Sequence, residues 1–367
     1  CLHCHNGGPG RIIGLGYIGE VPAEVPCGSS GTEYRYGTPT FKVKPDVHYL
    51  AGMDCIDCHN SDDLHGDGNI YSNMADQVAI RCETCHGTPE TFASLIDERG
   101  EPLSNVVKKG GASILTNKVS GKQLEVPQLA RMTREGSLPK AMAILPHVPL
   151  KEGRHILECY SCHAQTVTQC YGCHLKKDER KNSPVDWVVG IGERISTVSS
   201  PGVWTGETSY IRWEDPLLGL NGKGNISPYG PVCQVFLTHI VTAGRTVSLN
   251  RVFRLSDRNE DGMRLPGWGM NPTQPHTVTR ESRSCESCHT IEKSLGLGLP
   301  PGVSARLSPH TVPDLPSLER LVVEVGIQFQ ATSRPGARPF NQDELQLLSR
   351  FNVCLVCHSD MAYPDLW

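Results

Sequence analysis

The sequence predicts mostly irregular loops and short helices, with one small antiparallel β-subdomain at residues 185–280. Two features of the composition indicate this class. Glycine and proline, which interrupt regular structure, account for 37 and 27 of the 367 residues, whereas aromatic residues make up only 6%. Such a chain is poor in the side chains that build an ordinary core. Much of its buried apolar surface must therefore come from something other than side chains.

One five-residue pattern, C-x-x-C-H, occurs seven times in the chain. Its paired cysteines are Cys1 and Cys4, Cys55 and Cys58, Cys82 and Cys85, Cys159 and Cys162, Cys170 and Cys173, Cys285 and Cys288, and Cys354 and Cys357. The histidines that complete the copies are His5, His59, His86, His163, His174, His289 and His358. Seven copies of two cysteines use 14 of the 16 cysteines, and chance placement would give well under one copy.

C-x-x-C-H is the attachment signature of c-type haem. Two thiols three residues apart reach the two vinyl groups on one edge of the porphyrin, and the adjacent histidine ligates the iron. A structural zinc site needs four ligands and fixes no histidine at the next position, and a thioredoxin-type pair occurs once, in a βαβ unit. The pattern therefore predicts seven covalent haem c groups, with the loops and short helices wrapped around a chain of haems.

Each iron needs a second axial ligand unless its distal face is left open for chemistry. Eight histidines lie outside the motif-completing positions, which slightly exceeds the seven that bis-histidine ligation requires. Six of them lie near a motif or directly after a proline, where the backbone is restricted. These predicted distal ligands are His48, His65, His147, His155, His276 and His310. His3 could serve only a neighbouring haem, and His239 lies on an apolar strand face, where a core role is the alternative.

The spacing of the motifs divides the chain into three regions. Residues 1–184 hold five motifs, residues 185–280 hold strand-like runs broken by turn residues, and residues 281–367 hold two motifs. Residues 164–169 alone separate the fourth and fifth motifs, so their haems are tethered within about 24 Å of extended chain and are expected to be neighbours. Near the C-terminus, Asn341 and Glu344 predict a capping box that begins a helix.

Two further features lie outside the haem motifs. Cys27 and Cys233 are predicted to form a disulfide in an oxidising compartment, and two unrelated buried thiols are the alternative. A possible calcium loop supplies oxygen ligands at three positions, Asp257, Asn259 and Asp261. Trp268 stands where the last acidic ligand of such a loop is expected, so a solvated acidic turn is the alternative there.

The paired motifs within residues 155–174 resemble those of the large multihaem cytochromes of respiring bacteria and archaea. The stretches Gly52–His59 and Gln274–Thr277 carry the same resemblance. It implies export to the periplasm or the cell exterior, haem attachment outside the cytoplasmic membrane, bis-histidine ligation and closely stacked haems. Because the class includes polymeric cytochrome filaments, the expected donors and acceptors are other cytochromes or copies of this chain.

Electron transfer is the predicted function, and a multihaem oxidoreductase is the alternative. Hydroxylamine oxidoreductases and multihaem nitrite and tetrathionate reductases share the haem scaffold but keep one iron open or lysine-ligated. This chain has no C-x-x-C-K motif, and its histidine count leaves no iron necessarily unligated. Motifs near both chain ends favour one segment of a longer electron conduit, because a single-site enzyme has no need of them.

Two classes of partner are disfavoured by the sequence. A net charge of −4 offers no basic surface for nucleic acid. Runs of about 18 apolar residues, the length needed to span a bilayer, do not occur. The chain opens inside a motif at Cys1, so we expect a processed or incomplete N-terminus.

Overall fold

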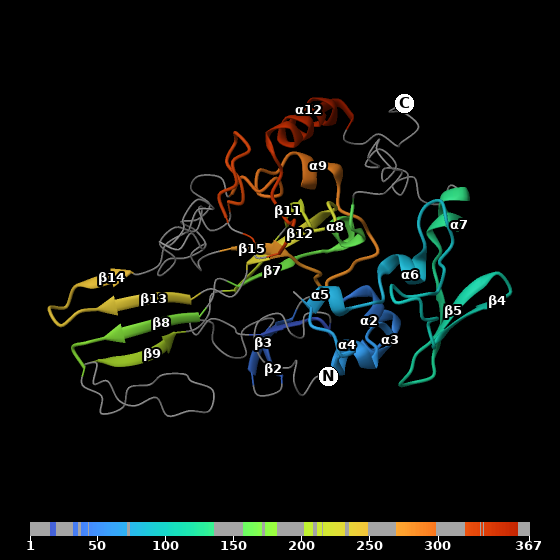
Figure 1. Cartoon of the computed structure of the whole chain (residues 1–367), viewed down its shortest axis with the longest axis horizontal. Helices are drawn as coiled ribbons and strands as arrows, with labels where there is room; N and C mark the ends of the chain where they lie inside the picture. The colour runs from blue at the N-terminus through green and yellow to red at the C-terminus, as the bar shows by residue number, and fades with distance from the viewer. Residues whose placement is uncertain are drawn as a thin grey trace.

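The computed structural model describes residues 15–19, 32–35, 38–42, 44–71, 74–135, 157–170, 173–181, 202–207, 211–214, 216–231, 235–248, 269–298, 320–330, 332 and 334–358. Short helices within these ranges carry four of the C-x-x-C-H motifs, and small sheets flank them (Figure 1). The helices are α2 (Val47–Ala51), α3 (Cys55–Cys58), α4 (Ser61–His65), α5 (Met74–Gln77), α6 (Cys82–His86), α7 (Leu129–Arg134), α8 (Cys159–His163), α9 (Cys285–His289) and α12 (Gln342–His358).

Fifteen short strands pair into five sheets in the described part of the chain. The strands are β1 (Tyr17–Gly19), β2 (Thr32–Arg35), β3 (Thr38–Lys42), β4 (Val106–Lys109), β5 (Ala112–Thr116), β6 (Gln123–Val126), β7 (Val167–Cys170), β8 (Cys173–Asp178), β9 (Val203–Glu207), β10 (Ile211–Glu214), β11 (Leu217–Leu220), β12 (Ile226–Pro231), β13 (Val235–Ile240), β14 (Thr246–Ser248) and β15 (Met270–Pro272). The sheet orders are β1-β3-β2, β4-β5-β6, β10-β7, β11-β12-β15 and β14-β13-β8-β9.

The sheets tie the motif regions to residues 185–280. Strands β9 to β15 all fall in that region, but two of its sheets also take in β7 and β8, which precede residue 185. Most pairings are antiparallel, whereas β8 and β13 run parallel. Figure 1 shows the four-stranded sheet β14-β13-β8-β9 reaching out to one side, away from the motif helices. A separate sheet, β4-β5-β6, lies within residues 1–184, where the sequence predicts loops and short helices.

Helices α3, α6, α8 and α9, which carry four of the motifs, are only four or five residues long, and in α3 and α6 a polar side chain at the third motif position caps the start of the helix. In α3, Asp57 Oδ2 accepts the backbone N–H of Asp54 at 2.8 Å. In α6, Thr84 Oγ1 accepts the N–H of Arg81 at 3.0 Å. Helices this short are unstable alone, because nucleation costs more than one turn returns. Capping and tertiary contacts therefore have to hold the motif helices in place.

Within the described residues, the buried apolar side chains form three small clusters. The first packs Leu95, Val106 and Leu115 against Cys85 of the third motif. The second surrounds Tyr229, whose side chain is fully buried and whose hydroxyl donates to the backbone oxygen of Leu220 at 2.6 Å. The third contains five buried residues, Leu218, Leu295, Val322, Phe340 and Leu345, with Cys288 of the sixth motif packed against them. Two of the clusters thus end on a motif cysteine.

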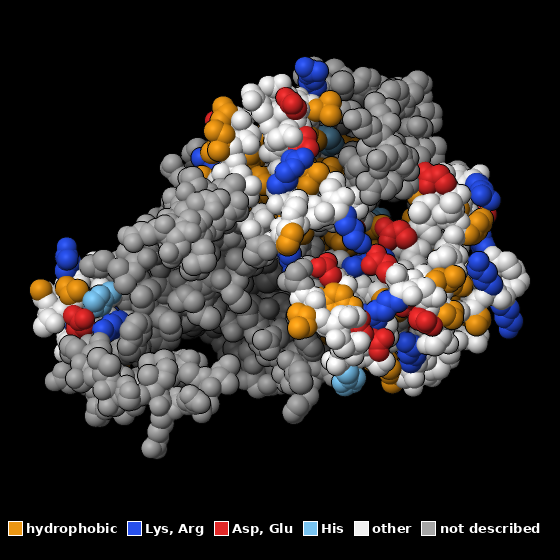
Figure 2. Space-filling view, in the orientation of Figure 1, with side chains coloured by type: hydrophobic (Ala, Val, Ile, Leu, Met, Phe, Trp, Pro, Cys, Tyr) orange, Lys and Arg blue, Asp and Glu red, His pale blue; other side chains and the backbone are white. Residues whose placement is uncertain are grey.

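Charged side chains of both signs are interspersed on the face that carries α2 to α7 (Figure 2). Arg81 and Lys223 both contact the Glu98 carboxylate at 3.2 Å, which joins the third motif to the turn between β11 and β12. Of the helices in the described residues, none combines the length and apolar character needed to cross a membrane.

Helix α12 begins at the predicted capping box, which the structure confirms. Asn341 Oδ1 accepts the N–H of Glu344 at 2.9 Å, and the Glu344 carboxylate accepts the N–H of Asn341 at 2.8 Å. Arg338 adds two bonds to the same carboxylate, each 2.8 Å long. Burial acts to raise the pKa of Glu344, but Arg338 and the Asn341 N–H lower it by more. The seventh motif occupies the far end of this helix, so the capped end fixes its direction.

We expect Glu344→Gln to destabilise the chain at neutral pH by about 1 kcal/mol, since it removes the ion pair and weakens the cap. Because the folded pKa of Glu344 is lowered, its contribution is present above the ordinary glutamate pKa of about 4.3 and is lost as the pH falls below it. Thermal unfolding at several pH values tests this. Asp343→Asn removes an exposed charge from the same helical turn and should have a smaller effect at every pH.

Candidate haem-binding site

Four motifs are described with their side chains, namely the second on α3, the third on α6, the fourth on α8 and the sixth on α9. In each, the first cysteine begins the helix and the second follows three residues later. Positions i and i+3 share one helix face, so both sulfurs are presented on the same side. The histidine comes next, at the end of the helix or at its C-cap. This placement suits two thioether bonds to one porphyrin edge.

Two motif histidines face predicted distal histidines at nearly the same separation. The ring centres of His86 and His48 are 6.0 Å apart, and those of His59 and His276 are 6.1 Å apart. Two imidazoles that bind one metal ion through nitrogens at about 2.0 Å each place their ring centres about 6 Å apart. Both pairs therefore leave the space that a single iron requires. His48 would serve the third motif and His276 the second.

The second ring nitrogen of two motif histidines is held by a backbone oxygen. His86 Nδ1 lies 2.9 Å from the backbone oxygen of Pro127, and His163 Nδ1 lies 3.0 Å from that of Thr279. On the distal side, His48 Nδ1 lies 2.8 Å from Asp46 Oδ1. A partner at Nδ1 fixes the tautomer and ring orientation and leaves Nε2 as the metal-binding nitrogen.

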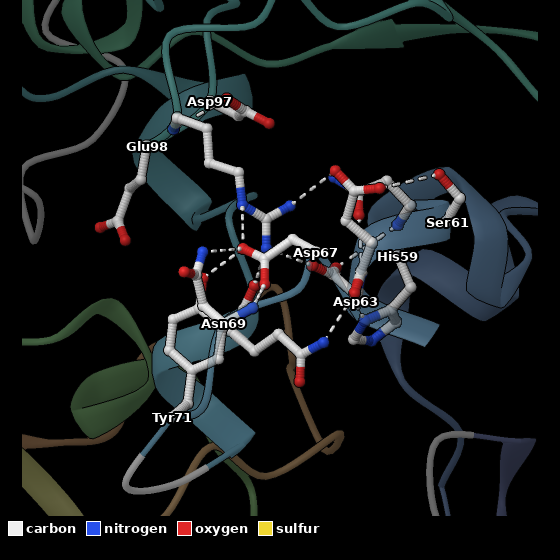
Figure 3. Close-up of polar contacts among 12 residues, drawn as sticks. His59, Ser61, Asp63, Asp67, Asn69, Tyr71, Asp97 and Glu98 are labelled. Atoms are coloured by element: carbon white, nitrogen blue, oxygen red, sulfur yellow. Dashed lines mark hydrogen bonds and ion pairs between the residues drawn. The ribbon is translucent and has the colours of Figure 1, made fainter. Parts of the chain in front are cut away.

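His59 has a charged network behind it (Figure 3). Its Nδ1 lies 3.5 Å from the almost fully buried carboxylate of Asp63, and Arg99 lies 3.5 Å from the other oxygen of that carboxylate. Arg99 also lies 3.9 Å from Asp67, where a hydrogen bond from Tyr71 lowers the Asp67 pKa to about 2. Asp63 of α4 thus contacts the His59 ring, and Arg99 links this carboxylate to Asp67 in the loop after α4.

Thiol pKa values show that neighbouring motifs lie close together. The pKa of Cys58 is raised to about 12, first by burial and then by the nearby Cys85 sulfur. A hydrogen bond with Cys82, followed by burial, raises the pKa of Cys159. The second motif therefore lies beside the third, and the third beside the fourth. At neutral pH these buried sulfurs are uncharged, as they are in a thioether.

The row continues through the fourth motif to the sixth. Burial and the nearby Cys288 raise the pKa of Cys162 to about 12. Cys288 in turn packs against the cluster that includes Leu345 of α12, the helix that carries the seventh motif. The spatial order is second, third, fourth, sixth and then the seventh-motif helix, and Figure 1 shows α9 beneath α12.

Residues 276–283 hold the fourth motif beside the sixth. The N–H of Thr279 donates to the backbone oxygen of His163, and the N–H of Arg283 donates to that of Cys162, both at 2.8 Å. The segment begins at His276 and leads into the sixth motif at Cys285. One stretch of chain therefore touches the sites of three motifs.

A cavity of about 720 Å³ lies between α6, α8 and the turn that joins β11 to β12. Its lining includes residues within and beside the motifs, among them Arg81, Glu83 and Tyr160. Glu158, just before α8, accepts a bond from Asn221 of the turn at 2.6 Å. Polar contacts through this turn thus join the third and fourth motifs around an open space.

The other predicted residues fall into three groups. His65 ends α4 and is exposed. His239 Nε2, the nitrogen that most axial histidines use for the metal, lies 2.8 Å from the carboxylate of Glu179. The fifth and seventh motifs are described through their backbone, with Cys170 ending β7, Cys173 and His174 beginning β8, and Cys354, Cys357 and His358 in α12. Outside the described residues lie Cys1, Cys4, His5, His3, His147, His155, His310, Cys27, Cys233, Asp257, Asn259 and Asp261.

The structure adds supporting residues that the sequence analysis did not identify. Asp46 and Asp63 contact ring nitrogens of candidate ligands, and Asp57 anchors the second motif. A signal for them exists in the sequence, because Asp46 precedes His48 by two residues and Asp63 follows His59 by four. Asp46 is the N-cap of the helix that carries His48, and Asp63 lies in the helix that directly follows His59, so each carboxylate lies next to a ring.

Asp57 is 3% exposed, and its carboxylate oxygens accept four hydrogen bonds. Besides the cap at Asp54, its oxygens accept Asn105 Nδ2 at 3.1 Å, Asn117 Nδ2 at 2.8 Å and the N–H of Lys118 at 2.9 Å. Asn105 and Asn117 flank the paired strands β4 and β5. The middle of the second motif is therefore fastened to the sheet β4-β5-β6.

Comparison with known proteins adds no family to this geometry. No protein-family model, curated protein or solved structure matches the chain. The chemistry of the site is therefore argued from the arrangement of its own residues.

We expect Asp57→Asn to destabilise the chain by about 3 kcal/mol, because an amide N–H₂ would face buried donors that need an acceptor. Glu286→Gln removes the same charge from the sixth motif at a half-buried position and should change stability by less than about 0.5 kcal/mol. Thermal unfolding of the purified chain compares the two. Equal losses would show that the Asp57 bonds do not support the motif.

Proposed function

We propose that this chain is a c-type cytochrome that moves electrons through seven covalently bound haems. The observation that carries the proposal is the pair of histidine separations, 6.0 and 6.1 Å, each joining a motif histidine to a predicted distal histidine. Both rings of a pair on one iron give a six-coordinate site, which favours electron transfer over substrate chemistry. The haem itself supplies the one-electron couple, and the protein's residues bind it and set its potential.

The order of the motifs supports a continuous route for electrons. Burial and a cysteine of a neighbouring motif together raise the pKa of Cys58, Cys159 and Cys162. These neighbours indicate that the second, third, fourth and sixth motifs lie in a row. Porphyrins attached through neighbouring cysteines would be neighbours as well. The fifth motif is not part of this row. Because only residues 164–169 separate it from the fourth motif, its haem would lie beside the fourth haem, either as a branch from the row or alongside it.

We further propose that the protein is exported to the periplasm or the cell exterior. The seven attachment motifs support this, because thioether attachment in the related class of cytochromes takes place outside the cytoplasmic membrane. Other cytochromes or copies of this chain are the proposed donors and acceptors.

The purified chain should carry seven haems, with at least six of them six-coordinate and low-spin. The reason is that eight histidines remain for seven irons. Haem content by pyridine haemochrome assay and spin state by electron paramagnetic resonance test this. Two or more irons with methionine, lysine or water as the distal ligand would contradict it. A single high-spin haem that reacts with hydroxylamine or nitrite would instead favour the oxidoreductase alternative.

Replacement of His48 by alanine should convert one haem to high spin without reducing the haem count, because attachment depends on Cys82 and Cys85. His276→Ala should do the same for a different haem. Tyr49→Ala is the matched control, because Tyr49 is exposed on the same helix as His48. An unchanged low-spin spectrum in His48→Ala would show that the 6.0 Å pair is not an axial pair.

A further inference from the structure

Asp46 bonds to two separate parts of the candidate site. Its Oδ1 accepts the backbone N–H of His48 at 2.9 Å and lies 2.8 Å from the Nδ1 of the same residue. Its Oδ2 accepts the N–H of Val278 at 2.7 Å. Val278 follows His276 by two residues. One carboxylate therefore contacts the distal histidine of one pair and the segment that carries the distal histidine of the other.

The environment of Asp46 makes both contacts strong. The residue is 7% exposed, so water screens its charge little. It is also the N-cap of α2, the helix that carries His48. Bonds in which one partner is charged are about twice as strong as neutral ones. The carboxylate can thus fix a ring and a backbone segment at the same time.

The Nδ1 partners of His59, His86 and His163 differ from that of His48 in charge or distance. His86 and His163 bond through Nδ1 to neutral backbone oxygens. His59 faces a carboxylate, but at 3.5 Å, and Arg99 lies 3.5 Å from the same Asp63 group. His48 therefore has the shortest contact with a carboxylate among these four histidines.

A carboxylate that accepts the Nδ1 proton makes the ligating Nε2 more basic. It also places a negative charge near the iron. Both effects stabilise the ferric state relative to the ferrous state and lower the reduction potential. The proton stays on Nδ1 in both oxidation states, so the effect requires no coupled proton transfer.

We propose that Asp46 is a positioning residue that lowers the potential of the haem on the third motif and holds the distal ligand of the haem on the second. The inference rests on the proposed function, since it requires His48 and His276 to be iron ligands. It makes the third-motif haem a low-potential step within the row of haems, and it couples that haem to its neighbour through one side chain.

The test is a spectroelectrochemical titration of the whole haem-loaded chain. Asp46→Asn and Asp46→Ser both remove the charge, and serine keeps an oxygen that can cap α2. In each variant one midpoint should rise by about 59 mV, which is a tenfold change in the equilibrium of a one-electron couple. Asp63→Asn is the matched control, because it removes a carboxylate beside His59 that is more distant and is paired with Arg99. Its shift should be smaller.

Haem count and spin state, measured on the same samples, distinguish failure of this inference from failure of the proposed function. Seven low-spin haems with unchanged midpoints in both Asp46 variants would overturn the inference and leave the proposed function intact. A shift spread evenly over all the haems, or equal shifts for Asp46→Asn and Asp63→Asn, would also overturn it, because only a general loss of charge would be seen. A wild-type chain without covalent haem would overturn the proposed function itself.

Discussion

Backbone hydrogen bonds of residues 276–283 determine how the motif helices are arranged. The segment lies outside any sheet, yet buried N–H and C=O groups must find partners. The N–H of Val47 donates to Val278 at 2.9 Å, and the N–H of Gln165 donates to Thr277, also at 2.9 Å. These partners lie more than a hundred residues earlier in the chain. Because a hydrogen bond fixes distance and direction more tightly than apolar contact does, the segment sets the spacing of the motifs it touches.

The apolar clusters explain why such bonds are needed. Each cluster contains about five buried residues, and two of them end against a motif cysteine rather than against another cluster. A chain with this much glycine and proline and so few aromatic residues cannot join the clusters with its own side chains. Under the proposed function the porphyrins fill the spaces between them. Polar side chains such as Asp57 then set the geometry, and the macrocycles add the missing apolar surface.

The sequence predicts local features of this structure well and distant pairings poorly. The capping box at Asn341 depends on residues three apart, so it could be read directly. The partner of each motif histidine could not. His48 lies closest in sequence to the second motif, yet it faces His86 of the third, and His276 lies before the sixth motif yet faces His59 of the second. Counting histidines gives the number of candidate ligands, whereas which histidines lie together depends on how the chain returns on itself.

The sheet β4-β5-β6 was missed for a different reason. Strands β5 and β6 are four or five residues long, and exposed Lys108 and Lys109 hide the alternation in β4. A signal was present, because Gly110 and Gly111 both adopt positive φ, at 58° and 80°, in the turn between β4 and β5. Two glycines between short alternating runs indicate a hairpin. The sheet matters to the site because Asn105 and Asn117, which flank its strands, bond to Asp57.

The short motif helices depend on distant segments of the chain for their stability. A helix of five residues cannot persist without partners, and here the partners include segments more than a hundred residues away. If the motif helices carry haems, each porphyrin joins two cysteines and two histidines, and for the second and third motifs the distal histidine comes from another part of the chain. Binding energy at such a site is folding energy, as it is for a structural metal. Under the proposed function, a distal histidine supplied from another part of the chain would make the haems of the second and third motifs cross-links, so that the stability of one site would depend on its neighbour being filled.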